Sequence, residues 1–431
     1  MALALDFPQH SALSTQHSQD LLRFSTAGSV DDGKSTLIGR LLYETKQIFD
    51  DQLEAVERAS KQQGADYLNL ALLTDGLRAE RQQGITIDVA YRYFATPRRK
   101  FIIADTPGHV QYTRNMVTGA STSDLALILV DARNGVVEQT RRHALLSALL
   151  GVPRMVVCVN KMDLAGYSRE TFESIRSEFE AFAAGLDVVD VTYIPISALK
   201  GDNVVERSSN MEWYDGEPLL TYLEHVPSAD YRRLDALRYP VQWVIRPLTD
   251  AHHDYRGYAG QIEAGSVRPG DEVLVLPAGL TTRVDSVDTF EGPLAEASAP
   301  QSVTLLLADH LDISRGDMIC SPDRPPRSTN SVEATLCWLG SDPLRLDAPY
   351  LIQHTTRRVR GVVSSLDHKL DPNTLDRDES ASTLRLNDIG RVSLRIAQPL
   401  FLDHYHDCRA TGSFILIDPA TNNTVAGGLV L

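Results

Sequence analysis

An eight-residue stretch near the start of the chain has the residue types and spacing of a phosphate-binding loop: Gly28-Ser29-Val30-Asp31-Asp32-Gly33-Lys34-Ser35. Two glycines let the backbone curl so that its N–H groups face phosphate oxygens, and the helix expected from Thr36 onward adds its positive dipole end. Lys34 supplies a full positive charge, and Ser35 is placed to bind a Mg²⁺ that bridges the β- and γ-phosphates. The stretch predicts a nucleoside triphosphate site, although a structural glycine-rich turn would give the same pattern.

A second group of phosphate and metal ligands is expected directly after a strand at 101–104: Asp105-Thr106-Pro107-Gly108-His109. A carboxylate at the carboxyl end of a parallel strand lies where such sheets contact ligands, so we expect Asp105 to hold Mg²⁺ through water. The N–H of Gly108 is expected to reach the γ-phosphate, and His109 to orient the attacking water. A single histidine is more often structural, but its place directly after Asp-x-x-Gly favours the catalytic interpretation.

Thr86 is the candidate for a residue whose position depends on the γ-phosphate. Its hydroxyl is expected to complete the Mg²⁺ shell and its N–H to contact the γ-phosphate, so that the surrounding loop orders only with the triphosphate. The alternative is a threonine that only starts an expected strand at 87–94. The neighbouring motifs favour the first interpretation, which makes Thr86 a catalytic residue together with Lys34 and His109.

Two later stretches predict that the base is guanine: Asn160-Lys161-Met162-Asp163 and Ser197-Ala198-Leu199. A carboxylate at Asp163 can accept hydrogen bonds from the N1–H and the 2-amino group of guanine, whereas adenine offers neither donor. Asn160 is expected to hold neighbouring loops together, and the stem of Lys161 to cover the base plane. A backbone N–H at Ala198 is expected to reach guanine O6.

These motifs fall at successive strand-to-helix turns, which predicts an α/β P-loop GTPase domain with a mainly parallel sheet over residues 21–228. A mostly helical insert is expected within it, with helices at 48–62 and 67–79. Residues 1–20, rich in Ser, Gln and His, are expected to form a mobile N-terminal tail.

The second half of the chain is expected to form two all-β barrel domains, at 238–326 and 330–431, because short β-rich runs alternate with turn residues. The Pro-rich stretch at 323–327 predicts the linker between them. The expected strands are 241–245, 260–264, 272–276 and 303–307 in the first barrel, and 331–339, 350–356, 357–365, 389–397 and 412–418 in the second.

Two side-chain clusters in the second barrel allow more than one interpretation. His404, His406 and Cys408 would share one face of an extended segment, but their spacing is not that of a common zinc motif, so a metal site is disfavoured. Three arginines between 357 and 360 would suit a phosphate or an acidic partner, but a solvated or salt-bridged strand face is favoured.

Composition narrows the class of protein. The chain has 431 residues, 43% of them hydrophobic and 23% charged, which is ordinary for a globular protein of several domains. A formal net charge of −15 argues against a nucleic-acid partner. The four cysteines include no C-x-x-C pair, which favours a reducing, cytoplasmic setting. Neither a signal peptide nor a membrane-spanning segment is expected.

In the order of its motifs and its two barrels, the chain resembles the elongation factor Tu and 1-alpha GTPase superfamily. Its phosphate loop departs from that of elongation factors, which carry histidines at the positions of Ser29 and Asp32. This variant and four further stretches are similar to the large GTPase subunit family of bacterial sulfate adenylyltransferase (ATP sulfurylase): Thr74–Glu80, Ile87–Phe94, Thr106–Met116 and Asn210–Tyr214.

The resemblance implies GTP and Mg²⁺ as ligands. It also implies a smaller catalytic subunit as partner, in a heterodimer or larger assembly that makes adenylyl sulfate and pyrophosphate from ATP and sulfate, driven by GTP hydrolysis. Val30 and Ile85 would form an apolar gate near His109. Neither nucleic acid nor a membrane is an expected partner. One alternative is a translation factor that binds tRNA or a release factor. Another is a signalling GTPase, but that function would give the two barrels no role.

Overall fold

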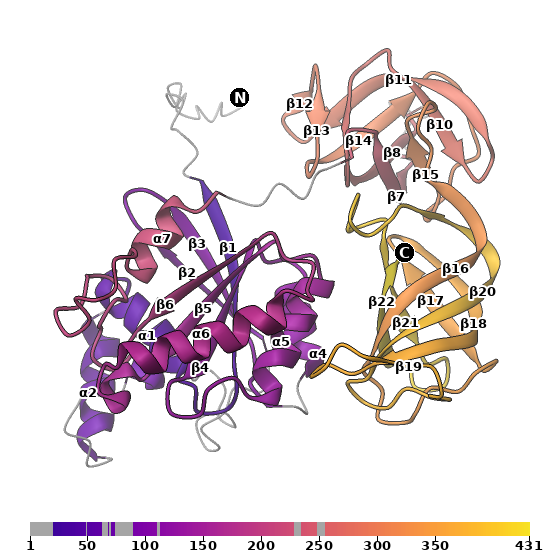
Figure 1. The fold of residues 1–431 in the computed structure, drawn as a ribbon. Helices are drawn as coiled ribbons and strands as arrows, with labels where there is room; N and C mark the ends of the chain where they lie inside the picture. The colour runs from indigo at the N-terminus through magenta and orange to yellow at the C-terminus, as the bar shows by residue number, and fades with distance from the viewer. Residues whose placement is uncertain are drawn as a thin grey trace, which may run out of the picture.

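The computed structural model describes residues 20–48, 50–62, 68, 70–73, 89–109, 113–227, 234–247 and 255–431. An α/β unit lies beside two all-β units, and the second β unit, coloured orange to yellow, is the one that lies against the α/β unit (Figure 1). The tail expected at 1–20 lies outside the described residues except for Asp20.

Six strands form the sheet of the α/β unit, in the order β2-β3-β1-β4-β5-β6. Only β2, at one edge, pairs antiparallel with its neighbour. Because parallel strands are covered on both faces, β4 is apolar along most of its length and buried at every position. The expected mainly parallel fold is confirmed. The strands are β1 Leu21–Ala27, β2 Ala90–Ala95, β3 Lys100–Asp105, β4 Leu125–Asp131, β5 Arg154–Asn160 and β6 Asp190–Pro195.

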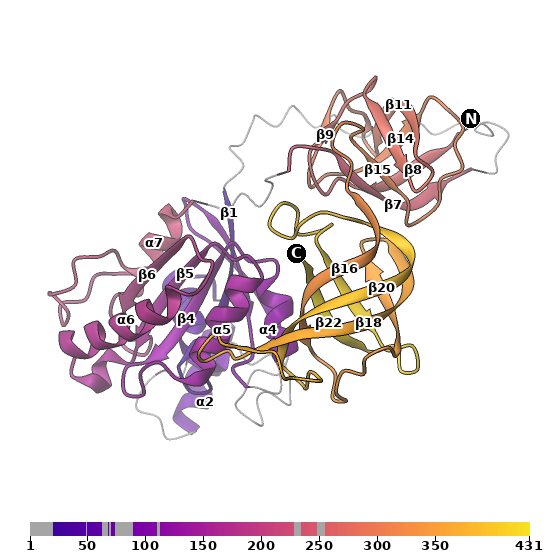
Figure 2. The same ribbon diagram turned by 45° about the vertical axis from the view of Figure 1, so that its right-hand side comes forward.

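Helices cover both faces of this sheet. Successive residues of a strand point to opposite faces, so Leu127 of β4 packs with Leu37 and Leu219, whereas Ile128 packs with Ala144 and Phe172. Figure 2 shows α4 and α5 on the side that faces the second β unit. The helices are α1 Lys34–Glu44, α2 Asp50–Gln62, α4 Thr113–Ala120, α5 Glu138–Leu149, α6 Arg169–Ala183 and α7 Leu219–His225, with 3₁₀ turns η1 Leu70–Leu73 and η3 Met162–Ala165.

The insert between α1 and β2 is described only in part. The helix expected at 48–62 is α2, and within the one expected at 67–79 the described element is η1. This turn packs closely on α1, since a Cβ on Gly39 would lie 2.2 Å from the carbonyl oxygen of Leu70. The strand expected at 87–94 is β2, and residues 74–88, which include Ile85 and Thr86, lie outside the described part.

The first β unit is a closed barrel in the order β10-β15-β7-β8-β14-β11, and β10 pairs with β11 to close it. The strand expected at 260–264 is misplaced by three residues, because β8 already ends at Gln261 and Gly265, with φ 71°, turns the chain. The strands are β7 Arg238–Ile245, β8 Gly257–Gln261, β9 Ser266–Val267, β10 Glu272–Leu276, β11 Leu280–Thr289, β12 Gly292–Pro293, β13 Ala297–Ser298, β14 Ser302–Leu307 and β15 Met318–Cys320.

The second β unit is also a closed barrel, in the order β17-β21-β22-β16-β20-β18, closed by pairing of β17 with β18. All five expected strands are present, and β19 and β22 were not predicted. The expected linker ends at Arg327, where β16 already begins. The strands are β16 Arg327–Trp338, β17 Pro349–His354, β18 Arg357–Leu370, β19 Arg377–Asp378, β20 Ile389–Leu402, β21 Ser413–Ile417 and β22 Thr424–Val430.

Within the described residues, two ion pairs join the barrels. Arg238 of β7 donates to both carboxylate oxygens of Asp403, with Nε–Oδ2 at 2.7 Å and Nη2–Oδ1 at 2.8 Å, and its side chain is almost completely buried. Arg357 of β18 lies 3.6 Å from Asp317, which confirms the salt-bridged interpretation for this arginine.

The second barrel contacts the α/β unit at the end of α5. The hydroxyl of Tyr405 donates to the carbonyl of Leu150 at 3.0 Å, and the guanidinium of Arg409 donates to the carbonyls of Ser121 and Gly151 at 3.2 and 2.5 Å. A cavity of about 820 Å³ lies beside these contacts, between α4, α5 and the barrel.

The possible metal cluster of the second barrel does not form a site. The rings of His404 and His406 stack with centroids 5.3 Å apart, while Cys408 is buried with apolar neighbours such as Leu234. Throughout the described residues, no group of three or more His, Cys, Asp or Glu side chains comes together as metal ligands. The described helices also include none that is long and apolar enough to cross a bilayer.

Candidate functional site

The predicted phosphate loop connects the end of β1 to the start of α1. Asp31 and Gly33 adopt left-handed backbone conformations, with φ of 66° and 93°. Glycine adopts such angles without strain, and aspartate tolerates them better than most residues. A Cβ on Gly33 would lie 2.4 Å from Nδ2 of Asn160, so a residue without a side chain is required where the loop at Asn160 crosses the predicted phosphate loop.

Lys34 lies inside this loop. Its Nζ donates to the carbonyls of Gly28 and Ser29 at 2.9 and 2.7 Å. Burial lowers the pKa of Lys34, and the nearby carboxylates, Asp32 foremost, act in the opposite direction. A Cβ on Gly108 would lie 2.3 Å from the ammonium nitrogen, so the Asp105–His109 segment packs directly on the phosphate loop through a glycine.

The predicted metal ligands come from neighbouring elements. Asp105 ends β3, is almost fully buried, and accepts a hydrogen bond from Oγ1 of Thr26 at 3.2 Å. Thr106 donates to the carbonyl of Thr26 at 2.6 Å, which ties the segment to β1. Ser35 is the second residue of α1 and is half-buried. A buried carboxylate and a hydroxyl are hard oxygen ligands, the kind that Mg²⁺ takes. Thr86 lies outside the described residues.

His109 directly follows the glycine that packs on the phosphate loop, and its side chain is half-buried. Gln139 of α5 donates to the carbonyl of Gly108 at 3.4 Å, which attaches this segment to α5. The proposed gate residue Val30 is 39% exposed at the outside of the loop, and its expected companion Ile85 is not described.

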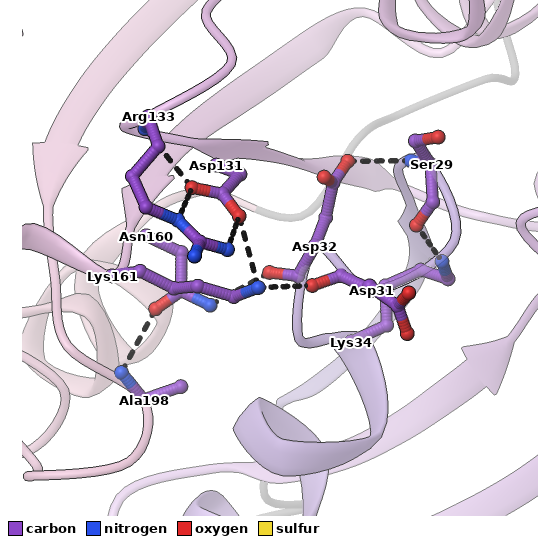
Figure 3. A network of polar contacts seen from close by, with 9 residues as sticks. All are labelled: Ser29, Asp31, Asp32, Lys34, Asp131, Arg133, Asn160, Lys161 and Ala198. Carbon is purple, nitrogen blue, oxygen red and sulfur yellow. Dashed lines mark hydrogen bonds and ion pairs between the residues drawn. The ribbon is translucent and has the colours of Figure 1, made fainter. Parts of the chain in front are cut away.

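The expected base-binding loop crosses the phosphate loop through Asn160 and Lys161 (Figure 3). Asn160 donates to the carbonyl of Asp32 at 2.7 Å and accepts from the N–H of Ala198 at 2.9 Å. Lys161 donates to the carbonyl of Asp31 at 2.5 Å. Two hydrogen-bonding residues therefore join three loops that lie far apart in the sequence.

The remaining residues of the expected guanine site lie around these two. Met162 is fully buried, and Asp163, in η3, is partly exposed. The N–H of Ala198 has Asn160 as its acceptor, so contact with guanine O6 would require a shared hydrogen bond. Ser197 accepts a hydrogen bond from the N–H of Lys200 at 3.2 Å, and Leu199 accepts one from Arg40.

The two positions that distinguish this loop from that of elongation factors contact each other. Oδ2 of Asp32 accepts a hydrogen bond from the N–H of Ser29 at 2.5 Å. Burial raises the pKa of Asp32, and the nearby Lys34 and this hydrogen bond oppose the rise. The N–H of Ser29, at the start of the predicted phosphate loop, would therefore have to exchange this partner to bind phosphate.

Three site residues were not predicted: Asp131, Arg133 and His143. Asp131 ends β4 next to Asn160 on β5, and Arg133 donates to it. The sequence did contain a signal for Asp131, a carboxylate that ends a fully apolar strand. No pattern pointed to His143, whose Nδ1 accepts a hydrogen bond from the N–H of Gly28 at 3.1 Å.

We expect acid to destabilise the protein through His143. Burial, and then the charge of Lys34, lower its pKa to about 3, whereas the unfolded chain has an ordinary value near 6.5. Below about pH 6.5 the unfolded state binds a proton that the folded state does not, so the free energy of unfolding falls as the pH falls. Above that pH His143 does not contribute to the pH dependence of stability. Between pH 7.5 and pH 5.5, protonation of His143 in the unfolded chain is expected to lower the free energy of unfolding by about 1.4 kcal/mol.

Urea unfolding of His143→Asn at both pH values measures this contribution. Asparagine keeps an acceptor for Gly28 but does not titrate, so the loss on acidification is expected to shrink by about 1.4 kcal/mol. His225→Asn, at a half-exposed position in α7, is the control and is expected to behave as the unchanged protein. An equal loss in His143→Asn would contradict the expectation.

The strand-loop-helix phosphate site, the parallel sheet and the two barrels define a GTPase of the translation-factor type. In agreement, residues 19–252 match the elongation factor Tu GTP binding domain family, and residues 331–431 match the GTP-eEF1A C-terminal domain-like family. The chain belongs to the sulfate adenylyltransferase subunit 1 family of these GTPases, as its relatives show.

One such relative is the sulfate adenylyltransferase subunit 1 of Alteromonas mediterranea, which is 51% identical over 98% of this chain and 89% of its own length. The bifunctional enzyme CysN/CysC of Mycobacterium tuberculosis is 60% identical over 95% of this chain and 67% of its own length. A crystal structure of sup35 complexed with GDP is 25% identical, with a TM-score of 0.43, over 98% of this chain and 97% of that one.

Proposed function

We propose that this chain hydrolyses GTP and that the hydrolysis drives the formation of adenylyl sulfate and pyrophosphate from ATP and sulfate on a smaller catalytic subunit. The relatives are named sulfate adenylyltransferase subunit 1, which supports this reaction and the existence of a partner subunit. The main support for GTP hydrolysis is that Lys34, Gly108 and Asn160, each from a different predicted motif, all contact the same phosphate loop.

In the proposed mechanism the chain's residues have separate tasks. The phosphates replace the carbonyls of Gly28 and Ser29 as partners of Lys34, whose charge opposes the negative charge that develops during transfer. His109 orients the attacking water. Mg²⁺, when bound, would neutralise further phosphate charge; we assign it to Ser35, Asp105 and Thr86.

We propose that all residues of the predicted motifs contact the nucleotide. These are the phosphate loop 28–36, the segment 105–109, and the two base loops 160–163 and 197–199. Asp163 selects guanine by accepting from two donors of the base. We also propose the domain limits expected above, 21–228, 238–326 and 330–431, and a cytoplasmic location, in line with four free cysteines.

The ATP and sulfate chemistry is assigned to the partner. The sequence has neither the Ser-Gly-Gly-x-Asp-Ser loop of pyrophosphatase-type ATP enzymes nor the His-x-Gly-His pair of the other sulfurylase class. With GTP on this chain and ATP on its partner, hydrolysis has to be communicated across an interface. Loops that contact the γ-phosphate are suited to this because their order changes with its presence.

Co-expression with candidate small subunits tests the proposal. Phosphate release from GTP by the purified complex is expected to rise when ATP and sulfate are both present, with pyrophosphate formed in parallel. A complex with Lys34→Ala is expected to lose both activities, whereas Lys200→Ala, at an exposed position, is expected to retain them. GTP turnover indifferent to ATP and sulfate would contradict the coupling, and binding of aminoacyl-tRNA by the GTP form would favour a translation factor.

A further inference from the structure

A single carboxylate at the end of β4 organises the loops around the base site. The side chain of Asp131 is only 2% exposed, and its two oxygens take part in four polar contacts (Figure 3). Arg133 supplies three of them, from its backbone N–H and Nε at 3.0 Å each and from Nη2 at 2.7 Å. The fourth is an ion pair with the Nζ of Lys161 at 2.9 Å.

Lys161 carries this connection onward to the phosphate loop. The same ammonium that pairs with Asp131 donates to the carbonyl of Asp31. Both Lys161 and Asp31 have left-handed backbone angles, with φ of 62° and 66°, so each loop is bent sharply at the point where they meet. One ammonium therefore bridges the phosphate-binding and base-binding halves of the site.

The charge on Asp131 persists despite its burial. Burial alone raises the pKa of the carboxyl, but the hydrogen bonds from Arg133 and Lys161 outweigh it and hold the pKa well below the usual range. A lysine stem has four rotatable bonds and is costly to order when a ligand binds. A permanently ionised partner orders that stem before the ligand arrives.

We propose that Asp131 is a positioning residue for the guanine nucleotide: it holds the Lys161 ammonium against the Asp31 carbonyl, so that the lysine stem is already in place beside the base. Arg133 in turn fixes the orientation of the carboxylate through a two-pronged contact. The inference rests on the proposed role of 160–163 as the guanine site. It adds a residue that lies outside all the predicted motifs.

The test measures the binding of fluorescently labelled GDP to the full-length chain. Asp131→Ala is expected to raise the dissociation constant for GDP about tenfold to a hundredfold, mainly through faster release of the nucleotide. The reason is that Lys161 loses the carboxylate that holds its side chain in place. Asp131→Asn is expected to lie between that variant and the unchanged protein. It also preserves the shape of the side chain if alanine prevents folding.

Asp124 provides a matched control. It precedes the same strand at the opposite end, is also buried, and accepts a hydrogen bond from the N–H of Arg23 at 2.8 Å. Asp124→Asn is expected to lower the melting temperature without changing GDP affinity. An Asp131→Asn or Asp131→Ala protein that binds GDP as tightly as the unchanged chain would overturn the proposal.

A double-mutant cycle with Lys161→Met separates positioning from general structural support. If Asp131 acts through the lysine, Asp131→Ala is expected to have little further effect on GDP affinity once the ammonium is absent. If the effects of the two substitutions on GDP affinity were fully additive, Asp131 would act independently of Lys161, which would contradict the proposal. Absence of GDP binding by the unchanged protein would overturn the proposed function as well, whereas normal binding with insensitivity to Asp131 would overturn this inference alone.

Discussion

Replacing Asp163 with asparagine is expected to change the nucleotide preference of the site from guanine to xanthine. In the proposed site the carboxylate would accept from two donors of guanine, the N1–H and the 2-amino group. An asparagine amide presents one acceptor and one donor, which clashes with the 2-amino group but matches the carbonyl that xanthine carries at the same position. A site left with mismatched polar groups rejects its ligand by about 10⁴-fold, so GTP affinity is expected to fall by about that factor.

Competition binding with GDP and xanthosine diphosphate measures this change. The position of Asp163 favours a clean result, because it lies in the short η3 turn, is partly exposed, and takes no part in the Asn160 and Lys161 contacts. Asp190→Asn, at an exposed position in β6, is the matched control and is expected to retain guanine preference. Undiminished GDP binding by Asp163→Asn would remove this carboxylate from the base site.

Replacing His109 with alanine is expected to slow GTP hydrolysis about 10²- to 10³-fold, the range typical of removing one positioned hydrogen-bonding group from an active site. GTP affinity is expected to stay nearly the same, because in the proposed site most of the nucleotide contacts come from the phosphate loop and the base loops. Gly108 packs on Lys34, so the neighbouring His109 lies next to the predicted phosphate loop. Single-turnover hydrolysis and equilibrium binding together separate the two effects.

His109→Gln gives a second measurement on the same position. A glutamine amide can also orient a water molecule, so this variant is expected to hydrolyse GTP faster than His109→Ala and slower than the unchanged protein. His225→Ala, in the last turn of α7, is the control and is expected to leave hydrolysis unchanged. A normal rate in His109→Ala would exclude this histidine from the mechanism.

The motifs of the GTPase unit were readable in the sequence because each is local. The strand, the turn and the helix start that make the phosphate loop occupy about fifteen consecutive residues, and their types follow from backbone angles and charge. The same holds for Asp105 at the end of β3 and for Asn160 at the end of β5. The roles of these residues, and of Thr86, stay predictions that the proposed experiments test.

Strand limits in the barrels were less predictable. Alternation of apolar and polar residues indicates that a strand exists, but the ends of the strand depend on pairing with other strands far along the chain. β8 lies three residues earlier than expected because Gly257–Gln261 pairs with β14, and β20 extends to Leu402 because β16 continues beside it. The three arginines at 357–360 likewise gave no indication that Arg357 would pair with Asp317 of the other barrel.

Residue types at short spacing were enough to predict the class of the phosphate loop, the guanine preference expected of Asp163, and the family. The sequence also contained the Ser29 and Asp32 variation, but not their mutual hydrogen bond. The contacts by which the loops hold one another became visible only in the folded structure. His143 accepts from Gly28, 115 residues away, and Asp131 meets Lys161 because β4 and β5 end side by side. The second contact follows from the parallel sheet, which brings the carboxyl ends of distant strands to one edge, whereas the first follows from the packing of α5 beside the phosphate loop; neither leaves a pattern in the local sequence.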